Sequence, residues 1–493
     1  MKRISNICCA LAASFCLAGQ AVGQTVSVNT GNISFAYAKA QVGEMTFDAG
    51  ETLTILGRTY NINDISSITV DDEQNVADNT VNVSFDGGEA KVLVAGNLAA
   101  DLSITIKGAN VRILANSNIT DPITYTLTGN SQQGSFYMDG EANAKVVIDN
   151  LTLASPDSAA IRIEDGKQIE LTLVGNSLLA DGAEGTQPAC LYINGHAIIS
   201  GDGQLTLSGT ARHAYSSDEY TLMQGGTMNI TGAVNDGMHV NEFFQMDGGT
   251  INITSQGDGI DVGKKAKSTH ELNGQMVVNN GSISANSTGV DANGASTTGK
   301  AIKAESHITI NGGTVTAKAS GASVFDTALS DMSSSSALKT DGNFVMTDGT
   351  LTLTNDGNGG RGLNATGNVT ISGGKTTIVT MGERYKYDST YDAKPQGMKS
   401  DGNISITGGK VYVAVAAPKA TTFKTDFLFT INGATVVGIG GKNVVPSTGS
   451  QAYTATTGSF AASETVTIGE TTYDFALPTG FSCSNAYVLV SNP

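Results

Sequence analysis

A repeat of glycine-containing corners constrains the fold of this 493-residue chain more than any other feature. The second glycine of each Gly-Gly, or its equivalent, recurs at intervals of 23, 32, 32, 36, 25 and 35 residues, at Gly226, Gly249, Gly281, Gly313, Gly349, Gly374 and Gly409. A minimum of 23 residues, with longer units between, is typical of a solenoid whose turns accept loops at fixed corners. A globular domain without repeats would not show a constant minimum interval between such glycines.

Apolar residues keep a constant phase within each unit. An apolar residue stands eleven positions before the second glycine in five units, at Met238, Ile302, Leu338, Leu363 and Met398. Apolar residues then alternate, as at Ile404 and Ile406, which predicts short strands with these side chains pointing inward. Three such strands per unit predict an all-β parallel β-helix with three sheets, in which glycine occupies corners that require positive φ.

The limits of the repeat predict the domain organisation. We assign residues 99–442 to the β-helix, residues 24–98 to a small N-terminal β module and residues 443–493 to a C-terminal β cap. Residues 1–23 combine two basic residues, a short apolar run and the small-residue pattern Ala21-Val22-Gly23, which is typical of a secretory signal peptide. The mature protein is therefore expected in the periplasm, at the cell surface or outside the cell.

Charge and cysteine content exclude several classes of protein. Without Lys2 and Arg3 of the signal peptide the chain has 26 basic and 45 acidic residues, a formal charge of −19, which argues against nucleic acid as a partner. No later stretch approaches the ~20 apolar residues of a membrane-spanning helix. Only Cys190 and Cys483 follow the signal peptide, so a disulfide framework is excluded, and Cys190 is expected to be a buried small hydrophobe. We expect a monomer.

Lysines recur at one position of the long units. The extra residues enter as loops at 286–299, 320–336 and 383–396, and each loop precedes a lysine: Lys303, Lys339 and Lys399. The unit that has almost no loop carries Asn364 there. The loops contain the carboxylates Asp291, Asp326, Asp331, Asp388 and Asp392. They predict either ion pairs that tie each loop to the β-helix or a groove that binds an acidic or hydroxyl-rich polymer.

The third loop, "ERYKYDSTYDAKPQG", also carries Tyr385, Tyr387 and Tyr391. A tyrosine offers an apolar ring face to sugar C–H groups and a hydroxyl for hydrogen bonding, so this cluster is a candidate saccharide platform. A loop that packs on the β-helix needs aromatic residues as well, and both interpretations stay open.

Acidic residues at two successive corners form a candidate metal site. Asp236 in "VNDGMHV" is expected to stack over Asp258 in "QGDGIDV", beside His239 and Asp261. Calcium–oxygen distances of ~2.3–2.6 Å allow one ion to bridge carboxylates on strands ~4.8 Å apart. Asp-Gly is also a common turn pair, so a purely structural role stays open. His213 has no cysteine or second histidine at a zinc-ligand spacing, which argues against zinc.

Three stretches, residues 134–153, 213–262 and "GMKSDGNISITGG" at 397–409, resemble the exported bacterial carbohydrate-binding β-helix proteins. The resemblance covers about residues 80–490. It implies a right-handed, pectate-lyase-like parallel β-helix, calcium at acidic corners with Asp236 and Asp258 at the matching positions, and binding of cellulose or polygalacturonate. This chain has Gln256-Gly257-Asp258 where similar sequences have a doubled aspartate.

These patterns favour a binding protein over an enzyme. The sequence contains no nucleophile elbow, His-Glu-x-x-His motif or phosphate loop, and we assign no catalytic residue. We predict non-catalytic polysaccharide binding with structural calcium. One alternative is a calcium-dependent polysaccharide lyase with a lysine such as Lys303 as base, but a lysine beside aspartates has its pKa raised. The other alternative is a structural or adhesin-like solenoid.

Overall fold

The computed structural model describes residues 24–42, 45–71 and 76–493, so the predicted signal peptide at 1–23 lies outside the described residues. Within these ranges the chain consists of β-strands, three short 3-10 helices and loops, without an α-helix, which confirms the all-β class. No helix of the described ranges has the length and apolar character needed to cross a membrane. The chain forms two compact units, one up to Ala154 with Ile163–Thr172 and one comprising Ser155–Arg162 and Leu173–Pro493.

The first unit is built mainly from paired strands and contains the 3-10 helices Lys39–Gln41, Ile62–Asp64 and Gly96–Leu98. Its strands are β1 Thr25–Thr30, β2 Ile33–Ala38, β3 Thr46–Asp48, β4 Thr52–Ile55, β5 Arg58–Asn61, β6 Ser67–Asp71, β7 Thr80–Asp86, β8 Glu89–Ala95, β9 Leu102–Lys107, β10 Ala109–Ala115, β11 Ile123–Ser131 and β12 Gly134–Asp139. β1 pairs antiparallel with β2 and β6, and β7 with β8. β7 buries Val81, Val83 and Phe85 and exposes the residues between them, so one face of the strand lines the core.

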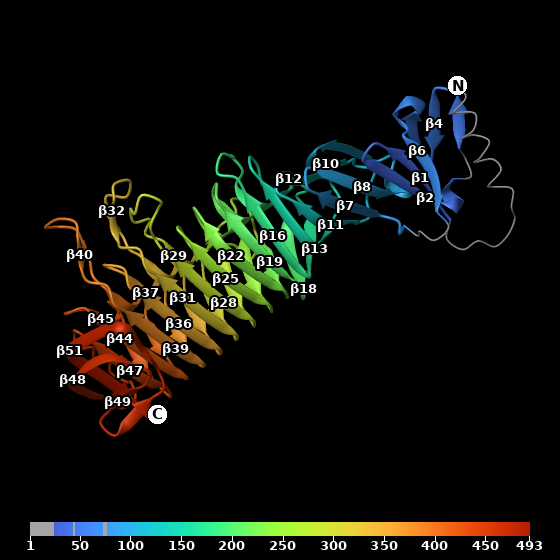
Figure 1. Ribbon diagram of the computed structural model, residues 1–493. Helices are drawn as coiled ribbons and strands as arrows, with labels where there is room; N and C mark the ends of the chain where they lie inside the picture. Colours follow the sequence, from blue (N-terminus) through green and yellow to red (C-terminus); the bar gives the residue numbers. More distant parts are fainter. Residues whose placement is uncertain (1–23, 43–44, 72–75) are drawn as a thin grey trace. The chain divides into compact units, whose positions relative to one another are not determined.

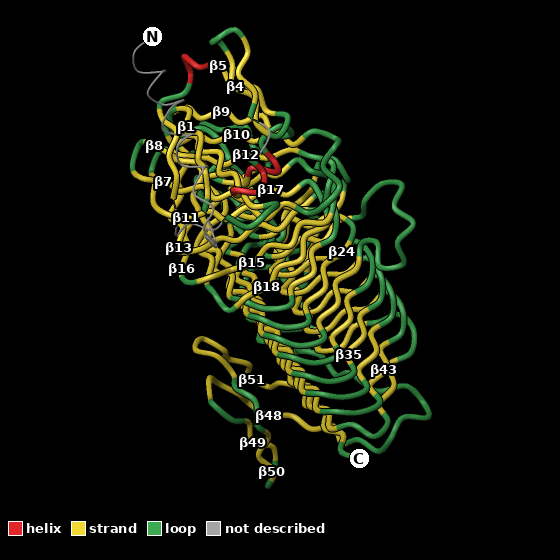
Figure 2. The backbone as a smooth tube through the Cα atoms, turned by 90° about the vertical axis from the view of Figure 1, so that its right-hand side faces the viewer, coloured by secondary structure: helices red, strands yellow, loops and turns green. Residues whose placement is uncertain are grey.

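Three strands lie where the chain alternates between the two units: β13 Ala144–Ser155, β14 Ile161–Ile163 and β15 Gln168–Val174. In the second unit, each repeat contributes one strand to each of three parallel ladders. Figures 1 and 2 show these strands as stacked rungs. Large parallel ladders are thus the dominant feature of this unit.

The strands of the first ladder are β17 Ala189–Ile193, β20 His213–Ser217, β23 Met238–Asn241, β26 Ile260–Gly263, β29 Lys300–Ala304, β34 Ser336–Thr340, β37 Arg361–Ala365, β42 Gln396–Ser400 and β45 Thr421–Lys424. The second ladder contains β18 His196–Gly201, β21 Thr221–Met223, β24 Phe243–Met246, β27 Gln275–Val278, β30 Ile308–Ile310, β35 Phe344–Met346, β38 Val369–Ile371, β43 Ile404–Ile406 and β46 Phe429–Ile431. The third contains β16 Asn176–Asp181, β19 Gln204–Gly209, β22 Thr227–Ala233, β25 Thr250–Ser255, β28 Ser282–Ser287, β31 Thr314–Ala319, β36 Thr350–Asn355, β39 Lys375–Thr380, β44 Lys410–Val415 and β47 Thr435–Gly440.

The register of the first ladder confirms the phase of the sequence repeat. The aliphatic residues of successive repeats pair directly and are fully buried; we call them the interior column: Met238, Ile260, Ile302, Leu338, Leu363 and Met398. Burying one such side chain contributes about 1.5–3 kcal/mol, so this column is a major source of stability.

The glycine corners also adopt the predicted conformation. Gly249 has φ +84° and Gly374 has φ +72°, in the left-handed region that favours glycine. A Cβ atom on Gly249 would lie 2.7 Å from the carbonyl oxygen of Gly226 in the preceding repeat. The corners therefore require glycine both for the backbone angle and for the close approach of neighbouring repeats.

The chain ends in four antiparallel strands: β48 Thr454–Ser463, β49 Val466–Ile468, β50 Thr471–Tyr473 and β51 Leu477–Ser491. β51 pairs with β47 and β48, and a cluster of buried side chains, including Tyr473 and Phe475, covers Val437 and Tyr412 of the third ladder. The domain boundaries at residues 98/99 and 442/443 stay predictions.

Candidate functional site

The first ladder carries a line of polar residues next to its interior column. The residues that follow the interior column lie in register with one another and with their counterparts on β17, β20 and β45. We call this line the outer column: Tyr192, Ser216, His239, Asp261, Lys303, Lys339, Asn364, Lys399 and Lys424. Successive strands lie ~4.8 Å apart, and alternation along a strand directs these side chains away from the interior. The structure thus brings the three predicted lysines into one column, with Asn364 between Lys339 and Lys399.

The lysines of the outer column are ion-paired with carboxylates of strands and corners. The distances from Nζ to Oδ1 are 2.9, 3.0 and 2.6 Å for the pairs Lys303–Asp261, Lys339–Asp341 and Lys399–Asp401. The interpretation that loop carboxylates tie the loops to these lysines is therefore wrong. Asp291 accepts hydrogen bonds from backbone N–H groups of its own turn, and Asp392 pairs with Arg384. A short carboxylate side chain in a turn accepts hydrogen bonds from backbone N–H groups of the same turn, so it does not extend to a neighbouring strand.

Two loops place an aromatic cluster beside the strands that carry lysines. The hairpins β32 Val324–Asp326 to β33 Asp331–Ser333 and β40 Tyr385–Lys386 to β41 Asp392–Ala393 precede β34 and β42, and Figure 1 shows β32 and β40 projecting from the stacked strands. Phe325 stacks on Tyr387 with ring centroids 4.4 Å apart and lies 4.8 Å from Tyr391. Tyr387 is 53% exposed.

The three predicted tyrosines therefore have different environments. Tyr387 and Tyr391 come together around Phe325, whereas Tyr385 pairs with Ala393 within the hairpin. Phe325 was not among the predicted site residues, although its loop occupies the same corner of the preceding long unit. Because loops have no repeat register, a contact between side chains of two loops has no signal in the sequence.

Asp236, at the corner before β23, lies beside two histidines of the first ladder, His213 on β20 and His239 on β23. We call His213, Asp236 and His239 the imidazole corner. Oδ2 of Asp236 lies 3.3 Å from Nδ1 of His213 and 3.5 Å from Nδ1 of His239. The two imidazole rings are stacked, with centroids 4.7 Å apart and planes 23° from parallel. The expectation that no second histidine accompanies His213 is wrong, because the next repeat supplies His239.

The other two predicted metal ligands have partners of their own. Asp258 donates its backbone N–H to Oδ1 of Asp236 at 2.8 Å, and Oδ1 of Asp258 accepts the backbone N–H of Lys300 at 2.7 Å. Asp236 and Asp258 thus do stack at successive corners, where each carboxylate accepts a backbone amide of the next repeat. Asp261 lies between His239, whose Nδ1 is 3.4 Å from Oδ2, and the Lys303 ammonium.

Burial and close charges shift the pKa values of this region in opposite directions. Burial would raise the pKa of Asp236, but hydrogen bonds to His213, His239 and the Asp258 amide hold it well below its usual range. Burial would lower the pKa of His239, but Asp236 and Asp261 raise it to about 9. Asp258 is more deeply buried and lies near other carboxylates, which raises its pKa to about 6 despite the nearby Lys300.

Calcium at Asp236, Asp258 and Asp261 stays a prediction, and the contacts around these residues fit it poorly. Calcium takes six to eight oxygen ligands. Here two imidazole nitrogens face the Asp236 carboxylate, and the Lys303 ammonium is paired with Asp261. An ammonium in contact with one of three expected ligands repels a divalent cation.

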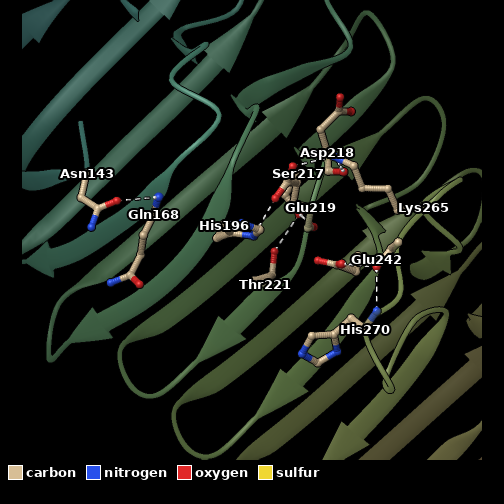
Figure 3. A network of polar contacts seen from close by, with 11 residues as sticks. Asn143, Gln168, His196, Ser217, Asp218, Glu219, Thr221, Glu242, Lys265 and His270 are labelled. Atoms are coloured by element: carbon tan, nitrogen blue, oxygen red, sulfur yellow. Dashed lines mark hydrogen bonds and ion pairs between the residues drawn. The ribbon is translucent and has the colours of Figure 1, made fainter. Parts of the chain in front are cut away.

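A second polar cluster lies at the opposite ends of these strands. In Figure 3, Nδ1 of His196 and Nζ of Lys265 approach the two oxygens of Glu219, each at 2.7 Å. Ser268 donates to Oε1 of Glu242 at 2.5 Å. A continuous stack of rings follows the same line, with centroids 4.6–4.7 Å apart, in the order His196, Tyr220, Phe243 and His270. Each carboxylate of this cluster has a donor at hydrogen-bonding distance.

A hollow of about 450 Å³ crosses four repeats at the turns that lead into the first ladder. Small residues line most of it, together with the exposed side chains of Val234 and Val290 and with Gln256. Apolar side chains beside polar backbone and amide groups are the lining found in many ligand sites. The hollow is therefore a second candidate ligand surface, besides the outer column, and it lies next to the upstream part of the first ladder.

Cys190 and Cys483 are free and buried, which confirms the prediction for Cys190. Burial raises the pKa of the Cys190 thiol well above its usual value. A buried neutral thiol is a poor nucleophile.

Comparison with known proteins agrees with the resemblance seen in the sequence. A family described as carbohydrate-binding domain-containing protein matches residues 115–384 and 338–441. No curated protein matches the chain. A solved structure, the gadolinium derivative of the polysaccharide lyase-like protein from C. thermocellum, shares 19% identity over 66% of this chain and 97% of that chain, with a TM-score of 0.36. Because the longer family match alone spans more than half of the sequence, the chain belongs to the carbohydrate-binding domain-containing protein family.

Proposed function

We propose that the chain is an exported, right-handed parallel β-helix that binds a polysaccharide along its outer column without cleaving it. The observation that carries the proposal is the register of Lys303, Lys339, Asn364, Lys399 and Lys424 on successive strands. Equal spacing of ~4.8 Å presents hydrogen-bond donors in a straight line, which suits a polymer with repeated oxygen atoms. Family membership supports carbohydrate as the class of ligand.

An acidic polysaccharide fits the downstream column best. The Lys399 side chain is 18% exposed, and that of its partner Asp401 is 51% exposed. Such a pair is worth about 0–1 kcal/mol, so a polymer carboxylate that approaches the column competes with Asp401 for the ammonium at little cost. The ring faces around Tyr387 supply an apolar contact for sugar C–H groups at the same corner.

The charge state of Lys303 favours binding over a lyase reaction. Burial alone would lower the pKa of Lys303, but the nearby Asp261 carboxylate more than offsets this effect and the pKa is raised. A lysine with a raised pKa keeps its proton and does not serve as a general base. It remains a donor to oxygen atoms, as a binding column requires.

Lys339→Ala with Lys399→Ala tests the proposal, with retention on immobilised polygalacturonate and on cellulose as the measurement. We expect at least tenfold weaker retention on polygalacturonate and a smaller change on cellulose, because two ammonium groups are removed. Lys318→Ala is the matched control: Lys318 lies on β31 of the third ladder and is likewise paired with an aspartate, Asp356. It should leave retention unchanged.

Two outcomes contradict the proposal. Equal losses in the control and in the double variant would show that the outer column has no special role. Steady formation of unsaturated product from polygalacturonate, followed by absorbance, would show that the protein is a lyase.

A further inference from the structure

The distances in the imidazole corner match a set of metal ligands better than they match short hydrogen bonds. A well-formed hydrogen bond from imidazole to carboxylate spans ~2.7–3.2 Å, and both Nδ1–Oδ2 distances at Asp236, 3.3 and 3.5 Å, are longer. Two ligand atoms held ~2.0–2.1 Å from one tetrahedral metal ion lie ~3.3–3.4 Å apart. The three ligand atoms all lie within 4.8 Å of one another. Modest movement of these side chains would bring all three to one small ion.

Backbone groups already orient these ligands. The Asp258 amide holds Oδ1 of Asp236 at 2.8 Å, which leaves Oδ2 directed at the two imidazoles. The Asp236 amide donates to Nδ1 of His213 across 3.2 Å. Because a backbone N–H only donates, Nδ1 accepts with its single lone pair, and a metal ion bound at Nδ1 would replace this long amide contact. The contact of the Asp258 amide with Oδ1 of Asp236 is of the outer kind that orients a ligand at metal sites.

The types of donor select the class of metal. Two imidazole nitrogens and one carboxylate oxygen suit zinc and neighbouring first-row transition metals, whereas calcium and magnesium take oxygen ligands. Three protein ligands leave one position for water or for a ligand oxygen, as in catalytic zinc sites. His239 has 28% of its side chain exposed, so this position is accessible from solvent.

The opposite cluster contains the same residue types at shorter distances. His196, Glu219 and Glu242 also bring their ligand atoms within 4.8 Å of one another. There, however, His196 and Lys265 lie 2.7 Å from the oxygens of Glu219, and Ser268 binds Glu242. An ammonium paired with one of the carboxylates repels a divalent cation, so this cluster is the poorer candidate for a metal site.

We infer that His213, Asp236 and His239 form a site for one borderline divalent transition metal ion, with Zn²⁺ as the best match. This inference concerns a different set of atoms from the lysines of the proposed polysaccharide site and does not depend on sugar binding.

The test uses the untagged chain from residue 24 onwards, freed of metal with a chelator, and no saccharide. Calorimetric titration with Zn²⁺ alone should give one bound ion per chain, and a hundredfold excess of Ca²⁺ should leave the ion bound. Co²⁺ in place of Zn²⁺ should show the visible absorption of a tetrahedral site. His239→Gln and Asp236→Asn should each weaken Zn²⁺ binding at least tenfold, whereas His196→Gln in the opposite cluster should leave it unchanged.

Three results would overturn the inference. They are the absence of Zn²⁺ binding to the wild-type chain, displacement of Zn²⁺ by an equal concentration of Ca²⁺, and undiminished Zn²⁺ binding in a folded His239→Gln variant. Circular dichroism establishes whether each variant is folded. The Zn²⁺ and Ca²⁺ competition and the Co²⁺ spectrum need only the wild-type chain, so the inference stays testable if a variant fails to fold.

Discussion

The upstream and downstream halves of the outer column differ in chemistry although they share one scaffold. Upstream, His239 and Asp261 belong to a mixed imidazole and carboxylate cluster, and downstream the column continues as lysines and Asn364. The interior column is aliphatic and fully buried along both halves. The repeat therefore fixes where a side chain lies, and the residue type at the outer-column position of each repeat sets what that position can bind.

The largest expected effect comes from the interior column, which both halves share. Leu363 is fully buried and pairs in register with Leu338 and Met398. Leu363→Ala removes apolar contacts and leaves a cavity, so we expect a loss of about 2–5 kcal/mol in the free energy of unfolding, measured by urea denaturation.

The control for this variant is Lys339→Met in the outer column, which keeps the aliphatic stem and removes a partly solvated charge. Its expected cost is below about 1 kcal/mol. Equal losses in the two variants would contradict the division into a stabilising interior column and a variable outer one.

Removing an aspartate that pairs with the outer column should cause a smaller loss of stability, and this loss should differ between the upstream and downstream halves. Asp261 is buried and contacts both His239 and Lys303. Asp261→Asn removes the ion-pair partner of Lys303 and leaves His239 with the carboxylate of Asp236 alone, so we expect a loss of about 1–3 kcal/mol in the free energy of unfolding. Asp341→Asn downstream should cost less than about 1 kcal/mol, because 42% of the Asp341 side chain is exposed. Urea denaturation of both variants measures these losses. A larger loss of unfolding free energy for Asp341→Asn than for Asp261→Asn would contradict the prediction.

The scaffold was predictable from the sequence because its constraints repeat. The glycine corners, the interior column and the alignment of Lys303, Lys339 and Lys399 all follow from one phase, which the strand register confirms. The same arithmetic would have found the imidazole corner, since Asp236 stands 23 residues, one short repeat, after His213. The predicted stack comprised Asp236 and Asp258 but not His213.

The partners of the outer lysines were not predictable in the same way. Asp341 and Asp401 each stand two residues after their lysine, at a corner where the direction of a side chain depends on the turn. The contact of Phe325 with Tyr387 joins two loops of different length, which share no register. Repetition determines positions on the ladders, whereas loop and corner contacts depend on local backbone geometry.

The smallest expected effect concerns the competition between Asp401 and a polyanion for Lys399. Asp401→Asn keeps the size of the side chain and removes the charge that occupies the ammonium, so affinity for polygalacturonate should rise, by up to about fivefold, because an exposed ion pair is worth less than about 1 kcal/mol. The gain should shrink as salt is raised, since screening weakens exposed charges. Affinity electrophoresis at two salt concentrations measures both effects. A loss of affinity would show that Asp401 itself contacts the polymer, and Lys399 would then act as part of a donor and acceptor pair rather than as a cation.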